Sequence, residues 1–373
     1  MKKRKTILNL IRDNVGSGKV NIIFTPKGID GESFLINDLS SFLKEVFPNC
    51  FISFIRDNTR TYELDLFNSF IDADKNFFIL INDLSLFKDP LSIINMFYGN
   101  KNINVIATTS VNIKQLSGKN ITDIRGRFIN YFYPPFLYGD ELDDNSVSSS
   151  ELFNKYFANY KFKSLAQKIY STIVEDAGDV LSFRTLYKAC HNETSLVTFV
   201  EIMNYLHDAG LFYLLPRVEI DNHEELDYGY VYYPTRCYDI LNLSTNPNMS
   251  QKLKAFYDSL IVARAFYDNQ TISRAFHTSR ETISSERVFV KLNNCFLIKN
   301  DDETVLLKTN YFNDNDISTN MFVNYKGKIQ KILVDDSNTA FHLDEKGILR
   351  CGVKYILEKG IFSYGDISKK QTN

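Results

Sequence analysis

A phosphate-binding loop joins a strand to a helix through a glycine-rich turn that ends in a lysine and a hydroxyl residue. Residues 20–39 offer part of this pattern: an apolar run at 20–25, a turn with proline and glycines, and the start of an amphipathic segment. In the spacing Gly-x-x-x-x-Gly-Lys-Ser/Thr, Pro26 falls on the first glycine, Gly31 on the second, Glu32 on the lysine and Ser33 on the hydroxyl residue. Together with Gly28 inside the turn, these residues are the candidate nucleotide-binding residues of this segment.

The residue at the lysine position has the wrong charge for this role. A lysine there contacts the β- and γ-phosphates of a nucleotide, whereas the carboxylate of Glu32 would repel them. Two like charges ~4 Å apart cost about 4 kcal/mol at an effective dielectric constant of ~20. Shifting the alignment by one residue puts Gly31 at the lysine position, so the cation is missing in either case. A Gly18-Lys19 pair precedes the apolar run instead of following it, and we interpret it as an ordinary turn.

A second candidate position follows the apolar run at residues 77–81. A magnesium-dependent ATPase places a pair of acidic residues at the end of such a strand, one near the metal ion and one near the attacking water. This chain has Asn82 and Asp83 there. An amide is a poor partner for Mg²⁺, and the aspartate side chain is shorter than that of glutamate. A buried strand that ends in a polar turn accounts for the same residues.

Short apolar runs alternate with amphipathic segments through residues 1–140. This alternation predicts a parallel α/β sheet, because parallel strands are joined by crossover helices. The expected strands are residues 20–25, 50–55, 77–82 and 104–108, and the expected helices are residues 33–45, 64–71 and 90–98.

The rest of the chain begins with an acidic, serine-rich stretch that contains a linker at residues 141–150. Residues 151–245 show three helical patterns and then two strand patterns, the order of a winged-helix domain, and Gly210 is expected to end the third helix. Residues 246–373 predict a small α+β domain. The expected elements after the linker are helices at 165–175, 183–189, 196–209 and 251–266, and strands at 211–218, 228–234, 287–292, 296–298, 304–307 and within 328–357.

Composition indicates a soluble globular protein and gives little functional information. Hydrophobic residues make up 44% of the 373 residues, charged residues 24%, and the formal net charge is −2, so nothing global attracts nucleic acid or a membrane. The five cysteines are scattered without metal-ligand spacing, which favours reduced thiols in the cytoplasm. No stretch approaches ~18 uninterrupted apolar residues. The 30 phenylalanines and 22 tyrosines against no tryptophan indicate a low-GC coding bias, as in low-GC bacteria, more than a function.

Further motifs follow the fourth expected strand in a fixed order: Thr109-Ser110, then Leu116, Gly126-Arg127 and Pro135-Phe136. With the candidate loop and Asn82-Asp83, this order resembles the AAA+ ATPases of bacteria and archaea that carry a winged helix and a restriction-nuclease-like C-terminal domain. The resemblance covers residues 1–245 and is weak beyond them. It implies that Thr109 occupies the polar sensor position and that Arg127 is a trans or sensor arginine for a γ-phosphate. The alternative for Arg127 is a surface arginine at a strand edge.

The winged-helix order raises the question of DNA binding. The candidate recognition helix, residues 195–208, contains no lysine or arginine and two acidic residues, although phosphate contacts dominate affinity for DNA. A modest basic patch could still come from nearby residues, namely Arg184, Lys188, Arg217 and Arg236. We expect weak DNA binding at most and a structural or protein-contact role for this module.

The C-terminal region lacks a convincing nuclease site. The resemblance implies a glutamate in the first helix of this region, where Asp258 lies nearby, and a Glu-Ile-Asp-Phe strand that is absent. Asp302 and Glu303 with Lys308 are an alternative metal-binding set, but a solvated charged turn explains them more simply. No histidine spacing indicates a metal site, and we expect none.

These observations favour a catalytically inactive AAA+-like pseudo-ATPase that acts as a binding or scaffold subunit. The site residues would be those of the candidate loop with Asn82, Asp83, Thr109 and Arg127, and no catalytic residue is expected. No cofactor is expected, although residual binding of ATP or ADP stays open. The partner would be another protein or a homologous ATPase subunit, with oligomers allowed and no membrane. Two alternatives remain: a nucleotide-binding AAA+ ATPase with a divergent loop that acts on DNA in defence or mobile elements, and a clamp-loader-like replication subunit.

Overall fold

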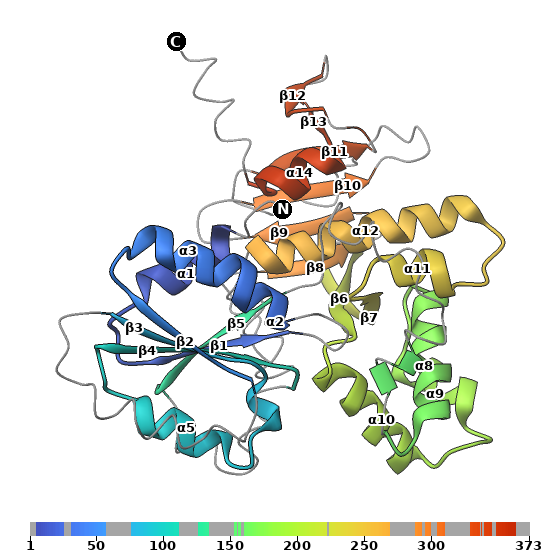
Figure 1. Cartoon of the computed structure of the whole chain (residues 1–373). Helices are drawn as coiled ribbons and strands as arrows, with labels where there is room; N and C mark the ends of the chain where they lie inside the picture. Colours follow the sequence, from blue (N-terminus) through green and yellow to red (C-terminus); the bar gives the residue numbers. More distant parts are fainter. Residues whose placement is uncertain are drawn as a thin grey trace. The chain divides into compact units, whose positions relative to one another are not determined.

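The computed structural model folds into two compact units, which consist mainly of Met1–Pro135 and Phe136–Asn373 (Figure 1). Each unit is considered by itself. The structure describes residues 5–25, 31–56, 76–111, 126–133, 153–154, 156–157, 160–221, 224–268, 288–292, 295–299, 304–309, 329–335, 337, 339–344 and 348–362.

The first unit contains a five-stranded parallel sheet, as the alternation of strand and helix patterns predicted. Its strands are β1 (Val20–Phe24), β2 (Phe51–Ile55), β3 (Phe77–Ile81), β4 (Ile103–Thr109) and β5 (Phe128–Phe132). The order across the sheet is β2-β3-β4-β1-β5, and every neighbouring pair is parallel. Strand β4 therefore lies between β1 and β3. Strand β5 was not predicted, because Asn130 interrupts its short apolar pattern.

Helices connect and cover these strands. The expected helix at residues 33–45 is observed as a run of α2 (Gly31–Ser33), a π-helical segment at Phe34–Leu39 and α3 (Ser40–Val46). Helix α5 (Pro90–Phe97) begins with proline after Asp89, whose side chain accepts a hydrogen bond from the Ser92 amide. Helix α1 (Lys5–Asp13) was not predicted, and the expected helix at 64–71 lies outside the described residues.

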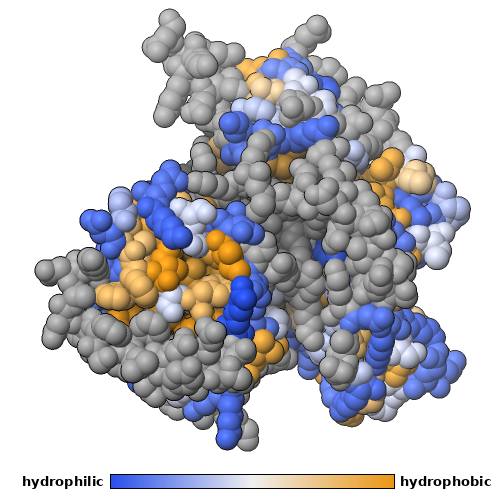
Figure 2. Space-filling view, viewed as in Figure 1, coloured by the Kyte–Doolittle hydropathy of each residue, from blue (hydrophilic) through white to orange (hydrophobic). Residues whose placement is uncertain are grey.

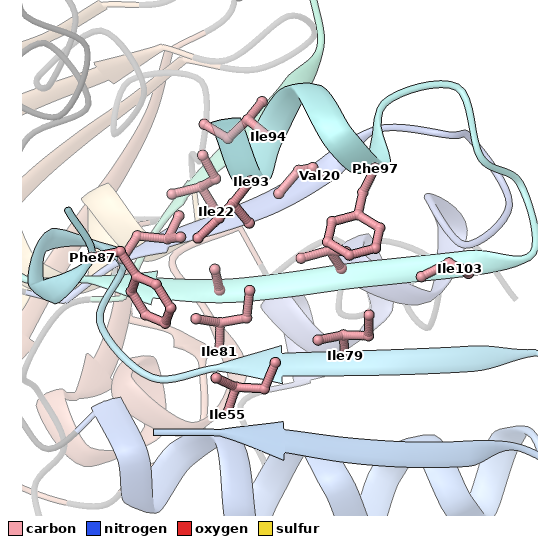
Figure 3. Close-up of a cluster of buried hydrophobic side chains, with 13 residues drawn as sticks. Val20, Ile22, Ile55, Ile79, Ile81, Phe87, Ile93, Ile94, Phe97 and Ile103 are labelled. Carbon is pink, nitrogen blue, oxygen red and sulfur yellow. The ribbon is translucent and has the colours of Figure 1, made fainter. Parts of the chain in front are cut away.

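A continuous apolar core joins α5 to one face of the sheet. Ile22 of β1, Ile79 and Ile81 of β3 and Phe97 of α5 all belong to this cluster and are fully or almost fully buried (Figure 3). Burial of a large aliphatic or aromatic side chain contributes ~1.5–3 kcal/mol, so this core accounts for much of the stability of the sheet. Strands β1 and β4 read as apolar runs without alternation because all of their residues are buried, on both faces of the sheet.

The second unit begins with the predicted order of three helices and an antiparallel hairpin. The helices are α8 (Lys163–Glu175), α9 (Phe183–Cys190) and α10 (Leu196–Asp208), followed by β6 (Phe212–Asp221) and β7 (Glu224–Pro234). Gly210 ends α10 with a positive φ of 65°, and the amide of Leu211 donates to the carbonyl of Leu206 at 3.0 Å.

The C-terminal strands share one sheet with this hairpin. Strand β6 pairs in parallel with β8, with Arg217 opposite Lys291, so the boundary expected between residues 245 and 246 lies inside the second unit. The order of the eight strands is β12-β13-β11-β10-β9-β8-β6-β7. The remaining elements are α11 (Tyr238–Leu243), α12 (Met249–Asp268), β8 (Val288–Leu292), β9 (Cys295–Lys299), β10 (Thr304–Thr309), β11 (Ile329–Asp335), β12 (His342–Leu343), β13 (Leu349–Gly352) and α14 (Val353–Lys359), a helix where strands were expected.

A buried carboxylate connects α8 and α11 in the second unit. Asp239 is fully buried, and its Oδ2 accepts hydrogen bonds from the hydroxyls of Tyr170 at 2.6 Å and Tyr156 at 2.8 Å. The Nε of Arg236, itself buried, lies 4.0 Å from Oδ1. Burial raises the pKa of Asp239, although Arg236 and the two tyrosines oppose that shift. Burial and then the Asp239 carboxylate raise the pKa of Tyr170 well above its ordinary value.

None of the helices in the described part of the chain combines the length and apolar character needed to cross a bilayer.

Candidate functional site

Several polar residues of the first unit lie at the carboxyl ends of its parallel strands. Thr25 follows β1, Arg56 follows β2, Asn82 follows β3, and Thr108 and Thr109 end β4. Because all five strands run in the same direction, these positions lie along one edge of the sheet, which we call the carboxyl edge. Open parallel sheets bind their ligands at this edge.

Gly31 allows the start of α2 to approach the strand ends closely. A Cβ atom at this position would lie 3.2 Å from side-chain atoms of both Thr25 and Thr108, closer than ordinary van der Waals contact. A phosphate-binding loop uses glycine for the same kind of close approach. Pro26 and Gly28 lie outside the described residues, and Ser33 is described only by its backbone in α2.

Both carboxylate oxygens of Glu32 are engaged by groups from neighbouring strand ends. The Nε of Arg56 lies 2.9 Å from Oε1, and the Nδ2 of Asn82 donates to Oε2 at 3.3 Å. The structure thus brings together Glu32 and Asn82, two of the predicted site residues. Arg56 was not a predicted site residue, although it is a cation directly after the second expected strand.

Thr108 connects the ends of β3 and β4. Its Oγ1 donates to Oδ1 of Asn82 at 3.2 Å and accepts a hydrogen bond from the amide of Asp83 at 2.9 Å. The side chain is almost completely buried. Thr108 was not a predicted site residue, because nothing in the sequence distinguishes the roles of two adjacent threonines.

Asp83 has a structural role in its own turn. The residue adopts a left-handed backbone conformation with φ of 50°, which aspartate tolerates better than most residues. Its Oδ1 accepts from the amide of Ser85 at 3.0 Å, the hydroxyl of Ser85 at 2.6 Å and the amide of Ser110 at 3.1 Å. The carboxylate therefore caps the 3₁₀ turn at Leu84–Leu86 and ties β3 to β4.

Thr109 lies at the carboxyl edge, but its hydroxyl is used locally. Oγ1 donates to the carbonyl of Val111 at 2.9 Å, and the side chain is 1% exposed. The neighbouring Ser110 hydroxyl lies 3.2 Å from that of Ser85. Both hydroxyls at the expected sensor position thus stabilise the turns that follow β3 and β4.

Arg127 lies at the opposite, amino edge of the sheet. Its carbonyl accepts from the amide of Val20, the first residue of β1, at 3.1 Å. Its guanidinium donates to the side chain of Asn95 and lies 5.5 Å from the ring centre of Tyr98. A sensor role within its own chain does not fit this position, because the length of β1 separates Arg127 from the carboxyl edge. A role toward a neighbouring subunit stays a prediction.

The Gly18-Lys19 pair also lies at the amino edge, where the chain enters β1. Gly18 has a φ of 71°, and its carbonyl accepts from the amide of Gly99 at 2.7 Å. A Cβ atom on Gly18 would lie 3.1 Å from backbone atoms of Gly99. The glycines here serve a close backbone contact, which agrees with the interpretation as an ordinary turn.

The charges along the described part of the carboxyl edge do not favour a triphosphate. Among the strand-end residues described above there is one guanidinium, that of Arg56, against two carboxylates, those of Glu32 and Asp83, and Arg56 is already paired with Glu32. In the part of the chain that the structure describes, no three histidine, cysteine, aspartate or glutamate side chains are grouped to hold a metal ion.

The fold of the second unit buries residues from two other candidate sites, the DNA-binding patch and the nuclease-like metal site. Arg236 is 5% exposed beside Asp239, so its expected place in a DNA-binding patch is wrong, and the side chain of Arg217 is not among those described. Asp258 is also buried, and its Oδ1 accepts from the hydroxyl of Thr309 at 2.6 Å. Lys308 is buried on β10, whereas Asp302 and Glu303 lie outside the described residues.

Comparisons with known proteins give only distant similarities. No protein-family model matches the chain, and no curated relative does. The chain is similar to a chain of Drosophila ORC bound to AT-rich DNA and Cdc6, with 12% identity, coverage of 62% of this chain and 89% of that chain, and a TM-score of 0.25. It is also similar to C. elegans PCH-2, with 13% identity, coverage of 54% and 68%, and a TM-score of 0.27. A mutant of Thermotoga maritima RuvB gives 13% identity, coverage of 65% and 95%, and a TM-score of 0.27. Similarities of this size assign neither a family nor a function.

Proposed function

We propose that this chain is a catalytically inactive AAA+-like protein that serves as a binding or scaffold subunit. The observation that carries the proposal is the environment of Glu32, which lies in the first turn of the helix after β1 and is bonded to Arg56 and Asn82. A nucleotide site needs a free cation at this place to receive phosphate. The chain supplies an internal ion pair instead.

The residues that would perform hydrolysis are also committed to other contacts. Asp83 holds the turn after β3 through three hydrogen bonds, and the hydroxyl of Thr109 bonds within its own turn. Activation of water requires a base that can accept its proton, and phosphoryl transfer requires stabilisation of the charge on the phosphate. The commitment of these groups to internal contacts supports the proposal that the chain does not hydrolyse nucleotide.

The same contacts explain how a scaffold keeps this edge ordered without a nucleotide. Glu32, Arg56 and Asn82 join the start of α2 to the ends of β2 and β3, and Thr108 joins β3 to β4. The strand ends are thus held by the chain's own polar groups. A partner protein, or a homologous ATPase subunit, would then meet a surface whose shape does not depend on nucleotide binding.

We expect purified protein to show no hydrolysis of ATP or GTP above background in the presence of Mg²⁺. The measurement is phosphate release over hours at millimolar nucleotide, with the Asp83→Asn variant as the matched control because it keeps the size of the side chain. Turnover that co-purifies with the protein and disappears in Asp83→Asn, with unchanged circular dichroism, would contradict the proposal.

The alternative of a working nucleotide-binding protein is favoured by one observation, the close approach at Gly31 that preserves the shape of the helix start. The hydrolysis assay decides between the two. The clamp-loader alternative requires a helical collar after the second domain, whereas the described residues after 287 form six strands and a single helix.

We expect duplex DNA to bind weakly and without specificity. Helix α10 carries no lysine or arginine, and the burial of Arg236 leaves Arg184 and Lys188 as the exposed cations on the neighbouring helix α9. Fluorescence anisotropy with a labelled duplex should give a dissociation constant above about 10 µM at physiological salt. A tighter complex that weakens steeply with salt and is lost in an Arg184→Glu, Lys188→Glu double variant would show that the module binds DNA.

A further inference from the structure

Helices α9 and α10 expose an unusual amount of apolar surface. Four large side chains here are exposed, and we call them the docking face: Phe183 at 39%, Leu196 at 51%, Val197 at 79% and Val200 at 38%. Helix α10 also buries Phe199, Ile202, Met203 and Leu206, so it has apolar residues on its outer side as well as on its core side. An ordinary surface helix presents polar residues outward.

Aromatic residues of α9 pack against one buried ring of α10, that of Phe199. Leu196 and Val200 are four residues apart on α10 and therefore neighbours on one helix face. Phe183 of α9 packs against Phe199 with ring centres 4.8 Å apart, and Tyr187, one turn further along α9, lies 5.3 Å from the same ring. The docking face therefore combines residues from both helices (Figure 2 shows apolar side chains among hydrophilic ones in this part of the molecule).

The unpaired charges beside the docking face are positive, because the acidic residues near it form ion pairs within the chain. Glu201 of α10 is paired with Lys161 at 2.7 Å, and Glu193 is paired with Lys168. Arg184 and Lys188 are exposed, and neither forms an ion pair or side-chain hydrogen bond with any residue that the structure describes. The first turn of α10 contains no acidic residue, so the positive end of its helix dipole adds to this field.

We propose that the docking face binds an acidic amphipathic helix of a partner protein. Apolar residues of the partner at helical spacing would cover Leu196, Val197 and Val200, and acidic residues beside them would pair with Arg184 and Lys188. Duplex DNA fits this surface poorly, because the central side chains can form no hydrogen bond with phosphate. A second copy of the chain fits poorly too, since a twofold contact through the same face would bring like charges together.

The test uses the full-length protein and two labelled helical peptides. The acidic probe carries leucines at i, i+3, i+4 and i+7 with glutamates on its flanks, and the basic probe replaces those glutamates by lysines. We expect the acidic probe to bind at least about tenfold more tightly than the basic one in fluorescence anisotropy. Val197→Asp should weaken binding of the acidic probe about tenfold, and Lys188→Glu should weaken it severalfold.

Met249→Asp is the matched control, because Met249 is 61% exposed on α12 in the same unit and lies outside the docking face. It should leave binding of the acidic probe unchanged. Equal affinity for both probes, or unchanged affinity in Val197→Asp, would overturn the proposal. So would a dimer in sedimentation that Val197→Asp dissociates, since the occupant would then be a second copy of the chain. This proposal does not depend on the nucleotide site.

Discussion

The Asp239→Ala variant should lose about 3–5 kcal/mol of unfolding free energy, because removal of one partner leaves other buried polar groups uncompensated. The hydroxyls of Tyr156 and Tyr170 both donate to the deleted carboxylate, and Arg236 would remain as a buried cation beside the gap. Urea unfolding followed by circular dichroism at neutral pH measures this loss.

An exposed ion pair provides the control for this variant. Glu193→Ala removes the partner of Lys168 at the surface of the same unit, where both side chains are about half exposed. Such pairs contribute roughly 0–1 kcal/mol, so this variant should unfold almost as the wild type does. Equal losses in Asp239→Ala and Glu193→Ala would show that the buried network adds no stability.

The pH dependence of stability gives an independent check on Asp239. Because burial raises its pKa in the folded chain, the folded state holds the proton more tightly than the unfolded state does. Its favourable contribution is therefore complete below the unfolded pKa of ~3.9 and is lost as the pH rises through the folded pKa. The wild type should gain stability relative to Asp239→Asn as the pH falls from 7 toward 4. The opposite trend would mean that the carboxylate form is the one that the fold favours.

Replacing Glu32 by lysine should raise nucleotide affinity about ten- to hundredfold. The change removes a carboxylate that repels phosphate, adds the missing cation and releases Arg56 from its ion pair. One pair of unit charges ~4 Å apart is worth about 4 kcal/mol at an effective dielectric constant of ~20. Solvent screening reduces this value strongly, since the Glu32 side chain is 36% exposed and that of Arg56 is 63% exposed.

A titration with a fluorescent ATP analogue and Mg²⁺ measures this gain. Asp13→Lys makes the same change in net charge at the end of α1 and should leave affinity unchanged. Glu32→Gln removes the repulsion without adding a cation and should give an intermediate affinity. If Glu32→Lys and Asp13→Lys behave alike, the segment around Gly31 does not bind phosphate, and the comparison with a nucleotide site fails.

Most strands of the first unit could be predicted from the sequence, because they depend on local patterns of apolar residues. The apolar runs that became β1, β3 and β4 are buried on both faces of the sheet, so they read as uninterrupted strands. Helix α1 was not predicted because its buried residues Ile7, Leu8 and Ile11 are set among basic and polar ones in a short segment. Strand β5 depends on pairing with β1, a contact between residues more than 100 positions apart.

Local patterns also led to two of the candidate site residues. Glu32 was selected from its place in the loop spacing and Asn82 from its place at the end of a strand, and the fold brings their side chains into contact. Arg56 could not be assigned to Glu32, since the order of strands across a sheet does not follow from their order in the chain. The error at Arg236 is of another kind: a charged residue just after the expected strand at 228–234 was predicted to be exposed, whereas it is buried beside Asp239 of α11.

The pairing of β6 with β8 limits how this protein can be divided. A chain that ended at residue 245 would keep α8, α9, α10 and the hairpin, but the backbone groups of β6 that face β8 would lose their partner strand. An unpaired strand edge is a template for association with other chains. The helices, the hairpin and the C-terminal strands should therefore unfold in one cooperative transition, and partial proteolysis should not release a stable helical fragment from them.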